Sequence, residues 1–453
     1  MTEPILYHST SRDVADASRA AHVRYRDALF LGLAPDGGLF MPNQIPELSQ
    51  SDLEALRGKT YSEVASAVLG KFLYSDFDSP SLRAITADAF DFDVLMEKFD
   101  ERTWLMRLDR GPTASFKDFA ARFMARAMSR LRSHEAEITV LVATSGDTGS
   151  AVGEAYRGLE GFRVVILFPE REVSSGQKQQ LESIGDNVDA VAIDGKFDEC
   201  QLLVKRAFTD PGLNRLHLTS ANSINVGRLL PQIVFYVFAW LEVADGHEPL
   251  VFSVPSGNFG NSLGCEIARR MGVPIERIVI AVNENDEFPV FLQTGRYEKI
   301  EPSRVCLSNA MNVGNPSNLA RFFDLYGGAL APDGRVERLP DVDEMRRRLF
   351  STSVSDEDTV SIMKQSYQRH GICLEPHGAV GVEAIRRFRA GGNDTRAVCL
   401  ETAHPGKFPE TLKAVLGIRI QPPESFARYA GRDRRVERMD ADYGSFKRYL
   451  LER

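Results

Sequence analysis

The chain has 453 residues, of which 43% are hydrophobic and 26% are charged, and this balance is typical of a globular protein rather than a disordered one. At roughly 150 residues per domain, the length predicts about two to three domains. The net charge of -8 comes from interleaved acidic and basic residues, which provide no broad positive surface for a nucleic-acid backbone. The composition therefore argues against nucleic acid as a partner.

The first twenty residues contain no basic segment followed by an apolar one, so no secretory signal is expected. The longest apolar stretch, residues 231–244, is too short to span a membrane and includes Glu242. We therefore expect a cytoplasmic protein that does not bind a membrane.

The cysteines and histidines indicate neither a disulfide framework nor a metal site. The five cysteines are scattered, form no CxxC pair and are odd in number. The eight histidines lack metal-ligand spacing. His370 and His377 flank Cys373, and we interpret all three as ordinary polar and core residues.

The first 95 residues have a mixed composition that ends in acidic, aromatic-rich stretches. We interpret residues 1–95 as an N-terminal cap domain. Within it, the glycines and prolines of residues 32–42 predict a sharp bend, or else a plain loop. Residues 96–453 are predicted to form an α/β region with two subdomains, the smaller around residues 130–225.

From about residue 100, apolar runs of strand length alternate with helical patterns, which indicates βαβ units and mainly parallel sheets flanked by helices. The runs are continuous, as in strands buried on both faces. The predicted strands are residues 138–143, 163–168, 188–193, 250–254, 278–282 and 396–401, and the predicted helices include 149–159, 261–273 and 343–350. In such sheets ligands bind where a strand ends and the next helix begins.

A loop rich in small residues, PSGNFGNSLG, follows the strand at 250–254 and precedes a helix. Glycines at 257, 260 and 264 let backbone N–H groups approach an anion, and the helix N-terminus adds about half a positive charge. The loop lacks the lysine of a Walker motif and does not fit GxGxxG. We interpret it as a phosphate-binding loop, with a structural turn as the alternative.

A second polar loop, TSGDTGSAV, follows the strand at 138–143. Its hydroxyls and backbone donors are suited to an anionic group such as a carboxylate. Asp147 is awkward in this interpretation, because a carboxylate repels another anion unless a proton or a cation intervenes. Two anion-binding loops indicate a ligand with two anchor points.

Lys117 falls in the first turn of a predicted helix, because apolar residues recur at helical spacing from Phe116 to Leu131. A helix N-terminus disfavours a cation and lowers the pKa of a lysine. Only a neutral amine attacks a carbonyl, so this position suits a lysine that binds a carbonyl cofactor. The alternative is a surface lysine paired with Asp118.

Seven segments in order resemble threonine synthases of the longer type with an N-terminal cap, over nearly the whole chain: RGPTASFKDF, ATSGDTGS, SANSINVGRLLPQ, PSGNFGN, NVGNPSN, LEPHGAVGVEA and TAHPGKFPE. The resemblance implies a fold-type II (tryptophan synthase β-like) enzyme that uses pyridoxal 5'-phosphate. It also implies the conversion of O-phospho-L-homoserine and water into L-threonine and phosphate, the last step of threonine biosynthesis. The expected partner is this small-molecule substrate, and the expected assembly is a monomer or homodimer.

The resemblance assigns roles to individual residues. Lys117 would hold the cofactor covalently, and Thr402 would face the pyridine nitrogen, where a hydroxyl leaves that nitrogen neutral. Asp147 would lie near the phenolic oxygen of the cofactor, a place where many relatives carry asparagine. The cofactor phosphate would be bound by Gly257, Asn258, Phe259, Gly260 and Asn261.

Further residues are expected to bind the substrate. Arg228 would bind the substrate phosphate through its planar fork of donors, together with Asn222 and Ser223, and Lys407 is a weaker candidate for the same role. The substrate carboxylate is assigned to Thr144, Ser145 and Thr148. A related phospho-lyase or a threonine or serine dehydratase that yields a 2-oxoacid is the alternative, and a catalytically silent sensor on the same fold is a second one. A dehydratase has no substrate phosphate for Arg228 to bind.

Overall fold

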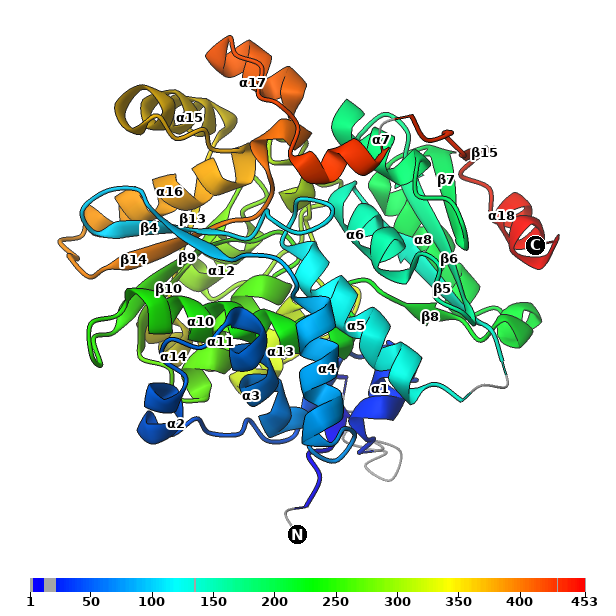
Figure 1. The fold of residues 1–453 in the computed structure, drawn as a ribbon, viewed down its shortest axis with the longest axis horizontal. Coiled ribbons are helices and arrows are strands. Elements are labelled where there is room, and N and C mark those ends of the chain that lie inside the picture. Colours follow the sequence, from blue (N-terminus) through cyan, green and yellow to red (C-terminus); the bar gives the residue numbers. More distant parts are fainter. Residues whose placement is uncertain (1–2, 12–21, 134–135, 430, 453) are drawn as a thin grey trace. The chain divides into compact units, whose positions relative to one another are not determined.

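The computed structural model describes residues 3–11, 22–133, 136–429 and 431–452 (Figure 1). The chain folds into two compact units, each built from two stretches of sequence. The first unit comprises Met1–Leu108 and Ser223–Ala403, and the second comprises Asp109–Asn222 and His404–Arg453.

A six-stranded sheet forms the centre of the first unit, in the order β13-β10-β9-β14-β4-β3. All neighbouring pairs are parallel except β3 and β4. Strand β9 is buried at every residue, as expected for a strand covered on both faces. The strands are β3 (Leu95–Lys98), β4 (Thr103–Arg107), β9 (Leu250–Pro255), β10 (Ile275–Val282), β13 (Leu349–Ser353) and β14 (Ala397–Glu401).

Helix α16 packs against four strands of this sheet, β9, β10, β13 and β14, and α15 packs on α16 (Figure 1). The first unit also contains a two-stranded pair, β11 (Ala329–Leu330) and β12 (Val336–Arg338). Its helices after residue 223 are α9 (Val226–Leu229), α10 (Ile233–Val243), α11 (Gly260–Arg270), α12 (Glu287–Thr294), α13 (Leu319–Leu325), α14 (Val342–Arg348), α15 (Asp356–His370) and α16 (Pro376–Arg389).

The N-terminal part of the first unit is mainly helical. Helix α3 packs on both α4 and α10, and Thr60 and Glu63 form a capping box at its start. The elements are β1 (Tyr7–Ser9), α1 (Tyr25–Leu31), β2 (Phe40–Pro42), α2 (Gln50–Ala55), α3 (Tyr61–Leu73) and α4 (Ser79–Ala89). The division of the chain at residue 95 stays a prediction.

The second unit contains a five-stranded, wholly parallel sheet in the order β15-β7-β6-β5-β8. Its core includes Leu141 and Val165 from the sheet and Phe446 from the last helix. The strands are β5 (Ile138–Ala143), β6 (Phe162–Pro169), β7 (Val188–Asp194), β8 (Thr219–Ser220) and β15 (Glu437–Asp440). The helices are α5 (Lys117–Leu131), α6 (Asp147–Tyr156), α7 (Ser175–Glu182), α8 (Phe197–Phe208), α17 (Pro409–Leu416) and α18 (Tyr443–Glu452).

The structure confirms the α/β class and corrects two details of the sequence interpretation. Helix α14 ends at Arg348, and Leu349 and Phe350, expected in that helix, begin strand β13. The second correction concerns the apolar stretch at residues 231–244, which was expected to be too short to span a membrane. The apolar helical segment runs from Val226 to Val243 and is long and apolar enough to cross a membrane, but 94% of it is buried inside the protein. Its apolarity is that of a core helix.

Candidate functional site

The loop between β9 and α11 presents unpaired backbone donors. The N–H groups of residues 257–261 donate no hydrogen bond to any residue that the structure describes. Phe259, just before the helix, adopts a left-handed conformation with φ of 60°. A Cβ at Gly257 would lie 2.7 Å from the carbonyl oxygen of Ala310, so only glycine fits there. Free donors at a helix N-terminus are the arrangement that binds a phosphate group.

Side chains of the same loop hold its shape. The amide nitrogen of Asn258 donates to Ser223 Oγ at 2.9 Å, and its amide oxygen accepts from the backbone N–H of Ser317 at 2.7 Å. The Asn261 side chain donates to the carbonyl of Pro255 at 2.7 Å. Both asparagine side chains therefore brace the loop, and the backbone donors stay available for a ligand.

Thr402, directly after β14, belongs to a buried hydrogen-bond network centred on Glu375. Its hydroxyl donates to Glu375 Oε1 at 3.2 Å. The same carboxylate accepts from the backbone N–H groups of His377 and Gly378 at the start of α16 and from His377 Nδ1. His377 Nε2 accepts from the N–H of Ala310 at 3.1 Å, which fixes the proton on Nδ1. The Thr402 oxygen therefore keeps its lone pairs for another donor.

Lys117 begins helix α5, as predicted, and its side chain is only 13% exposed. Its Nζ lies 3.3 Å from Asp147 Oδ2. The alternative of a surface pair with Asp118 is wrong, because Asp118 is buried and accepts from the backbone N–H and the hydroxyl of Thr113 at 2.9 and 2.7 Å. Lys117 is therefore a shielded amine beside the Asp147 carboxylate.

Asp147, at the start of α6, is bound by two lysines. Its Oδ1 accepts from Lys407 Nζ at 2.8 Å and from the Gln177 amide at 3.0 Å, while Oδ2 faces Lys117. Burial alone raises the pKa of a carboxyl, but the charges of Lys407 and Lys117 outweigh it and hold the pKa of Asp147 well below its usual range. Asp147 is therefore ionised although only 1% exposed.

The loop from 144 to 149 is partly satisfied by its own side chains. Thr144 Oγ1 accepts from the N–H groups of Gly146 and Gly149 at 3.0 and 2.9 Å, so this hydroxyl shapes the loop. Ser145 and Thr148 are half-buried, and no hydrogen bond joins their hydroxyls to the described part of the chain. These two residues are the better placed candidates for a carboxylate.

The residues predicted to bind the substrate phosphate are divided between the units. Asn222 lies in the second unit, where its side chain pairs with both backbone groups of Ala143. Ser223 and Arg228 lie in the first unit, and Arg228, in α9, is 3% exposed. Lys407 is fully buried, and its Nζ binds Asp147 and the carbonyl of Thr113 at 2.9 Å, so a phosphate contact would require breaking that ion pair.

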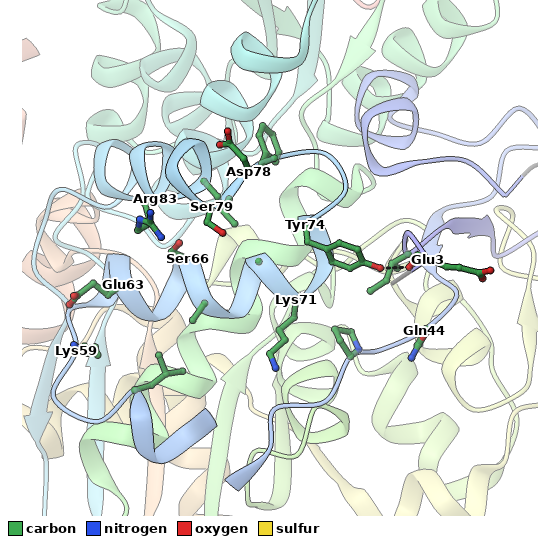
Figure 2. A pocket seen from close by; sticks show the side chains of 17 residues that line it. Glu3, Gln44, Lys59, Glu63, Ser66, Lys71, Tyr74, Asp78, Ser79 and Arg83 are labelled. Carbon is green, nitrogen blue, oxygen red and sulfur yellow. Dashed lines mark hydrogen bonds between the residues drawn. The ribbon is translucent and has the colours of Figure 1, made fainter. Parts of the chain in front are cut away.

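A pocket of about 1110 Å³ lies in the N-terminal part of the first unit, and no predicted site residue lines it. Figure 2 shows Glu63 and Lys71 on α3 and Tyr74 directly after it at this pocket, with the Tyr74 hydroxyl bound to the carbonyl of Glu3. Acidic and basic side chains are mixed there, and Lys71 is paired with Asp52 at 2.9 Å. The candidate residues therefore lie elsewhere: those around Lys117 belong to the second unit, and those around Gly257 and Thr402 belong to the first.

Comparison with known proteins identifies the family of the chain. The family pattern described as Pyridoxal-phosphate dependent enzyme matches residues 90–402, that of the threonine synthase N terminus matches 7–90, and that of the threonine synthase C-terminal region matches 378–450. The chain is 36% identical to threonine synthase of Haemophilus influenzae over 432 residues, 95% of this chain and 97% of that protein. It is 34% identical to the Escherichia coli enzyme over 431 residues, which covers 95% of this chain and 96% of that one. The chain belongs to the threonine synthase family.

Solved structures extend the similarity to three dimensions. Threonine synthase from Escherichia coli superposes with a TM-score of 0.88 at 32% identity and covers 98% of this chain and 99% of its own. The pyridoxal-phosphate-bound threonine synthase from Brucella melitensis gives 0.89 at 32% identity, with 99% of both chains covered. Tomato threonine deaminase, at 17% identity and a TM-score of 0.55, shares the fold alone. The chain is thus a fold-type II, pyridoxal-phosphate-dependent member of the threonine synthase family.

Sequence interpretation missed several members of the site. Glu375 precedes Pro376 at the start of α16, and an N-capping acid before proline is a recognisable signal that we did not use. Gln177 and Thr113 carry no pattern of their own, since they complete the site only through folding. The roles of the individual site residues stay predictions, although the free donors of the 257–261 loop and the shielded Lys117 fit a phosphate-bearing aldehyde cofactor.

Proposed function

We propose that this chain is a threonine synthase that converts O-phospho-L-homoserine and water into L-threonine and phosphate with pyridoxal 5'-phosphate. The observation that carries the proposal is the shielded Lys117 amine, held by Asp147 within a unit that also offers the 144–149 loop. The free backbone donors of residues 257–261 support a phosphate-bearing cofactor. Bound pyridoxal phosphate supplies an electron sink for the bond that breaks at the α-carbon.

The residues of the chain would then perform three tasks. The Lys117 amine removes the α-proton and relays protons at the β-carbon. Ser145 and Thr148 bind the substrate carboxylate, with Thr144 shaping the loop. Arg228, with Asn222 and Ser223, binds the γ-phosphate and stabilises the charge that grows as this group leaves. Because serine and threonine lack that phosphate, Arg228 also selects the substrate.

The remaining assignments are proposals of the same kind. Residues 1–95 would form the cap domain and residues 96–453 the catalytic region. Thr402 would face the pyridine nitrogen. Its hydroxyl donates to Glu375 in the structure, so donation to a neutral ring nitrogen would require that hydroxyl to turn away from Glu375. We also propose a cytoplasmic location and a monomeric or homodimeric assembly.

The test is product analysis of the purified holoenzyme. With O-phospho-L-homoserine we expect threonine and phosphate in equal amounts, and no product from L-serine or L-threonine under the same conditions. Formation of 2-oxobutyrate in place of threonine would replace the proposal with a phospho-lyase or dehydratase. The Lys117→Arg variant, which keeps the charge but not the nucleophilic amine, is the matched control and should give no product.

A further inference from the structure

The buried ion cluster around Asp147 contains one more charge than the proposed chemistry uses. Asp147 lies in a loop that otherwise offers donors to an anion, where a lone carboxylate would repel such a ligand. The structure places two ammonium groups on this carboxylate, Lys407 on Oδ1 at 2.8 Å and Lys117 on Oδ2 at 3.3 Å. The proposed reaction uses Lys117 and gives no task to Lys407.

Lys407 is fixed in place from several directions. Its side chain is 0% exposed, and its Nζ also donates to the carbonyl of Thr113 at 2.9 Å. Its own carbonyl accepts from the Ser174 hydroxyl at 2.8 Å, at the start of α7. Such a lysine cannot leave Asp147 without stranding two buried charges, which is strongly unfavourable.

The other groups facing the cluster do not replace Lys407. Helix α7 contributes two uncharged amides. The Gln177 amide donates to Asp147, and the Gln180 amide donates to the Thr113 carbonyl. Helix α5 contributes Asp118, whose pKa burial raises although Thr113, Lys407 and Arg122 act to lower it. Within the described residues, the cation that contacts Asp147 besides Lys117 is therefore Lys407.

A charge balance follows from this arrangement. When Lys117 attaches to the cofactor, its nitrogen replaces the aldehyde oxygen, which leaves as water, and the amine must first be neutral. With Lys407 present, loss of that proton leaves a balanced pair of one ammonium and one carboxylate. Without Lys407, loss of the Lys117 proton would leave Asp147 as an isolated buried anion. The Asp147 charge would therefore stabilise the protonated form of Lys117.

We propose that Lys407 is the permanent counter-ion of Asp147 and that this pairing frees Lys117 to lose its proton. Lys407 is thus a positioning residue rather than a contact of the substrate phosphate. The inference rests on the proposed role of Lys117 as the cofactor lysine, and it explains why a carboxylate is tolerated at position 147.

The test measures covalent attachment of pyridoxal phosphate to the apoenzyme, followed by absorbance across pH, with no substrate present. We expect Lys407→Met to shift the pH midpoint of the attachment rate upward by about one to three units, so attachment at neutral pH slows roughly tenfold or more. The double variant Lys407→Met/Asp147→Asn should return the midpoint toward that of the wild type. Lys407→Arg keeps the charge and is the matched control.

The single variant Asp147→Asn gives a second and opposite readout. With the carboxylate gone, Lys407 repels the charge on Lys117, and the midpoint should move to lower pH. An unchanged pH profile in a folded Lys407→Met protein, or an upward shift in Asp147→Asn, would overturn the proposal. If Lys407→Met does not fold, the double variant is compared with Asp147→Asn: removal of the Lys407 charge should raise the midpoint, and an equal midpoint in the two would overturn the proposal. Attachment without threonine formation would count against the proposed function and leave this inference standing.

Discussion

Each unit has a glycine-rich loop that connects a parallel strand to a helix, and the two loops differ in whether they contain a charged residue. The loop at 257–261 contains no charged residue and leaves its backbone donors free. The loop at 144–149 contains Asp147, and Thr144 satisfies two of its donors. The first loop is therefore suited to a permanent dianion such as phosphate, whereas the second places a carboxylate beside the Lys117 amine.

The same contrast appears between two buried carboxyls. Asp147 is bound by two lysines and is ionised, whereas Glu287, at the start of α12, is 3% exposed and its oxygens accept no hydrogen bond from any other described residue. Burial raises the pKa of Glu287 to about 8. Local partners, rather than depth of burial, thus decide which acid carries charge.

The largest expected effect concerns the lysine of the charged loop. Replacing Lys117 with Ala should remove the absorbance of the bound cofactor and lower turnover by a factor on the order of 10⁴ or more, because the amine serves both attachment and proton transfer. Spectra and steady-state rates of the variant measure both. A variant that kept either property would remove Lys117 from the centre of the site.

The next effect tests whether Thr144 shapes its loop. Thr144→Val should lower the free energy of unfolding by about 2–4 kcal/mol, because two buried N–H groups lose their acceptor. Urea unfolding of the apoenzyme measures the change, and Thr144→Ser, which keeps the hydroxyl, is the control. Equal stability of the valine variant and wild type would leave the hydroxyl free for a ligand role.

A smaller effect is expected in the uncharged loop. The Cβ of a Gly257→Ala variant would meet the backbone of Ala310 and Met311 at 2.7 and 2.8 Å. We expect a loss of about 1–3 kcal/mol in stability and weaker cofactor binding, both measurable by thermal unfolding with and without cofactor. Gly70→Ala in α3, where the nearest atom is 3.6 Å away, should be neutral or slightly stabilising. Normal cofactor affinity in Gly257→Ala would separate this loop from phosphate binding.

The last change concerns Glu287, and its effect on stability depends on pH with a defined sign. Its folded-state pKa of about 8 lies above the ordinary value of 4.5, so between these pH values the folded protein holds a proton that the unfolded chain releases. Stability contributed by the neutral acid is therefore present below about pH 4.5 and falls as pH rises toward 8. Glu287→Gln should stabilise the protein by about 1–3 kcal/mol near pH 7 and little at low pH, as urea unfolding would show. A gain in the free energy of unfolding that did not change with pH would contradict the ionisation of Glu287 as its cause.

The sequence predicted most of the central sheets because their strands are apolar on both faces. Strands β5, β6, β7, β9, β10 and β14 were expected within a few residues. Strand β15 (Glu437–Asp440) was missed because it is a largely exposed, charged edge strand with no apolar pattern. Strand β13 was missed because it follows α14 without a turn residue, so the helical pattern appeared to continue into Leu349.

The site was predictable where it is local in sequence. Both loops follow strands, and Lys117 begins its helix, so their positions were found from pattern and family resemblance. The pairing of Asp147 with Lys407 was not predictable, because folding brings together residues from distant parts of the chain. The same limit applied to Glu375, whose contact with Thr402 depends on how α16 begins beside β14.

The central claim is that Lys117 reacts with the cofactor while its neighbour Lys407 stays an ammonium. Borohydride reduction of the holoenzyme, followed by proteolysis and mass spectrometry, locates the modified lysine. The account predicts that the pyridoxyl group is found on the peptide containing Lys117 and that Lys407 is unmodified. Modification of Lys407, or of neither lysine, would contradict it.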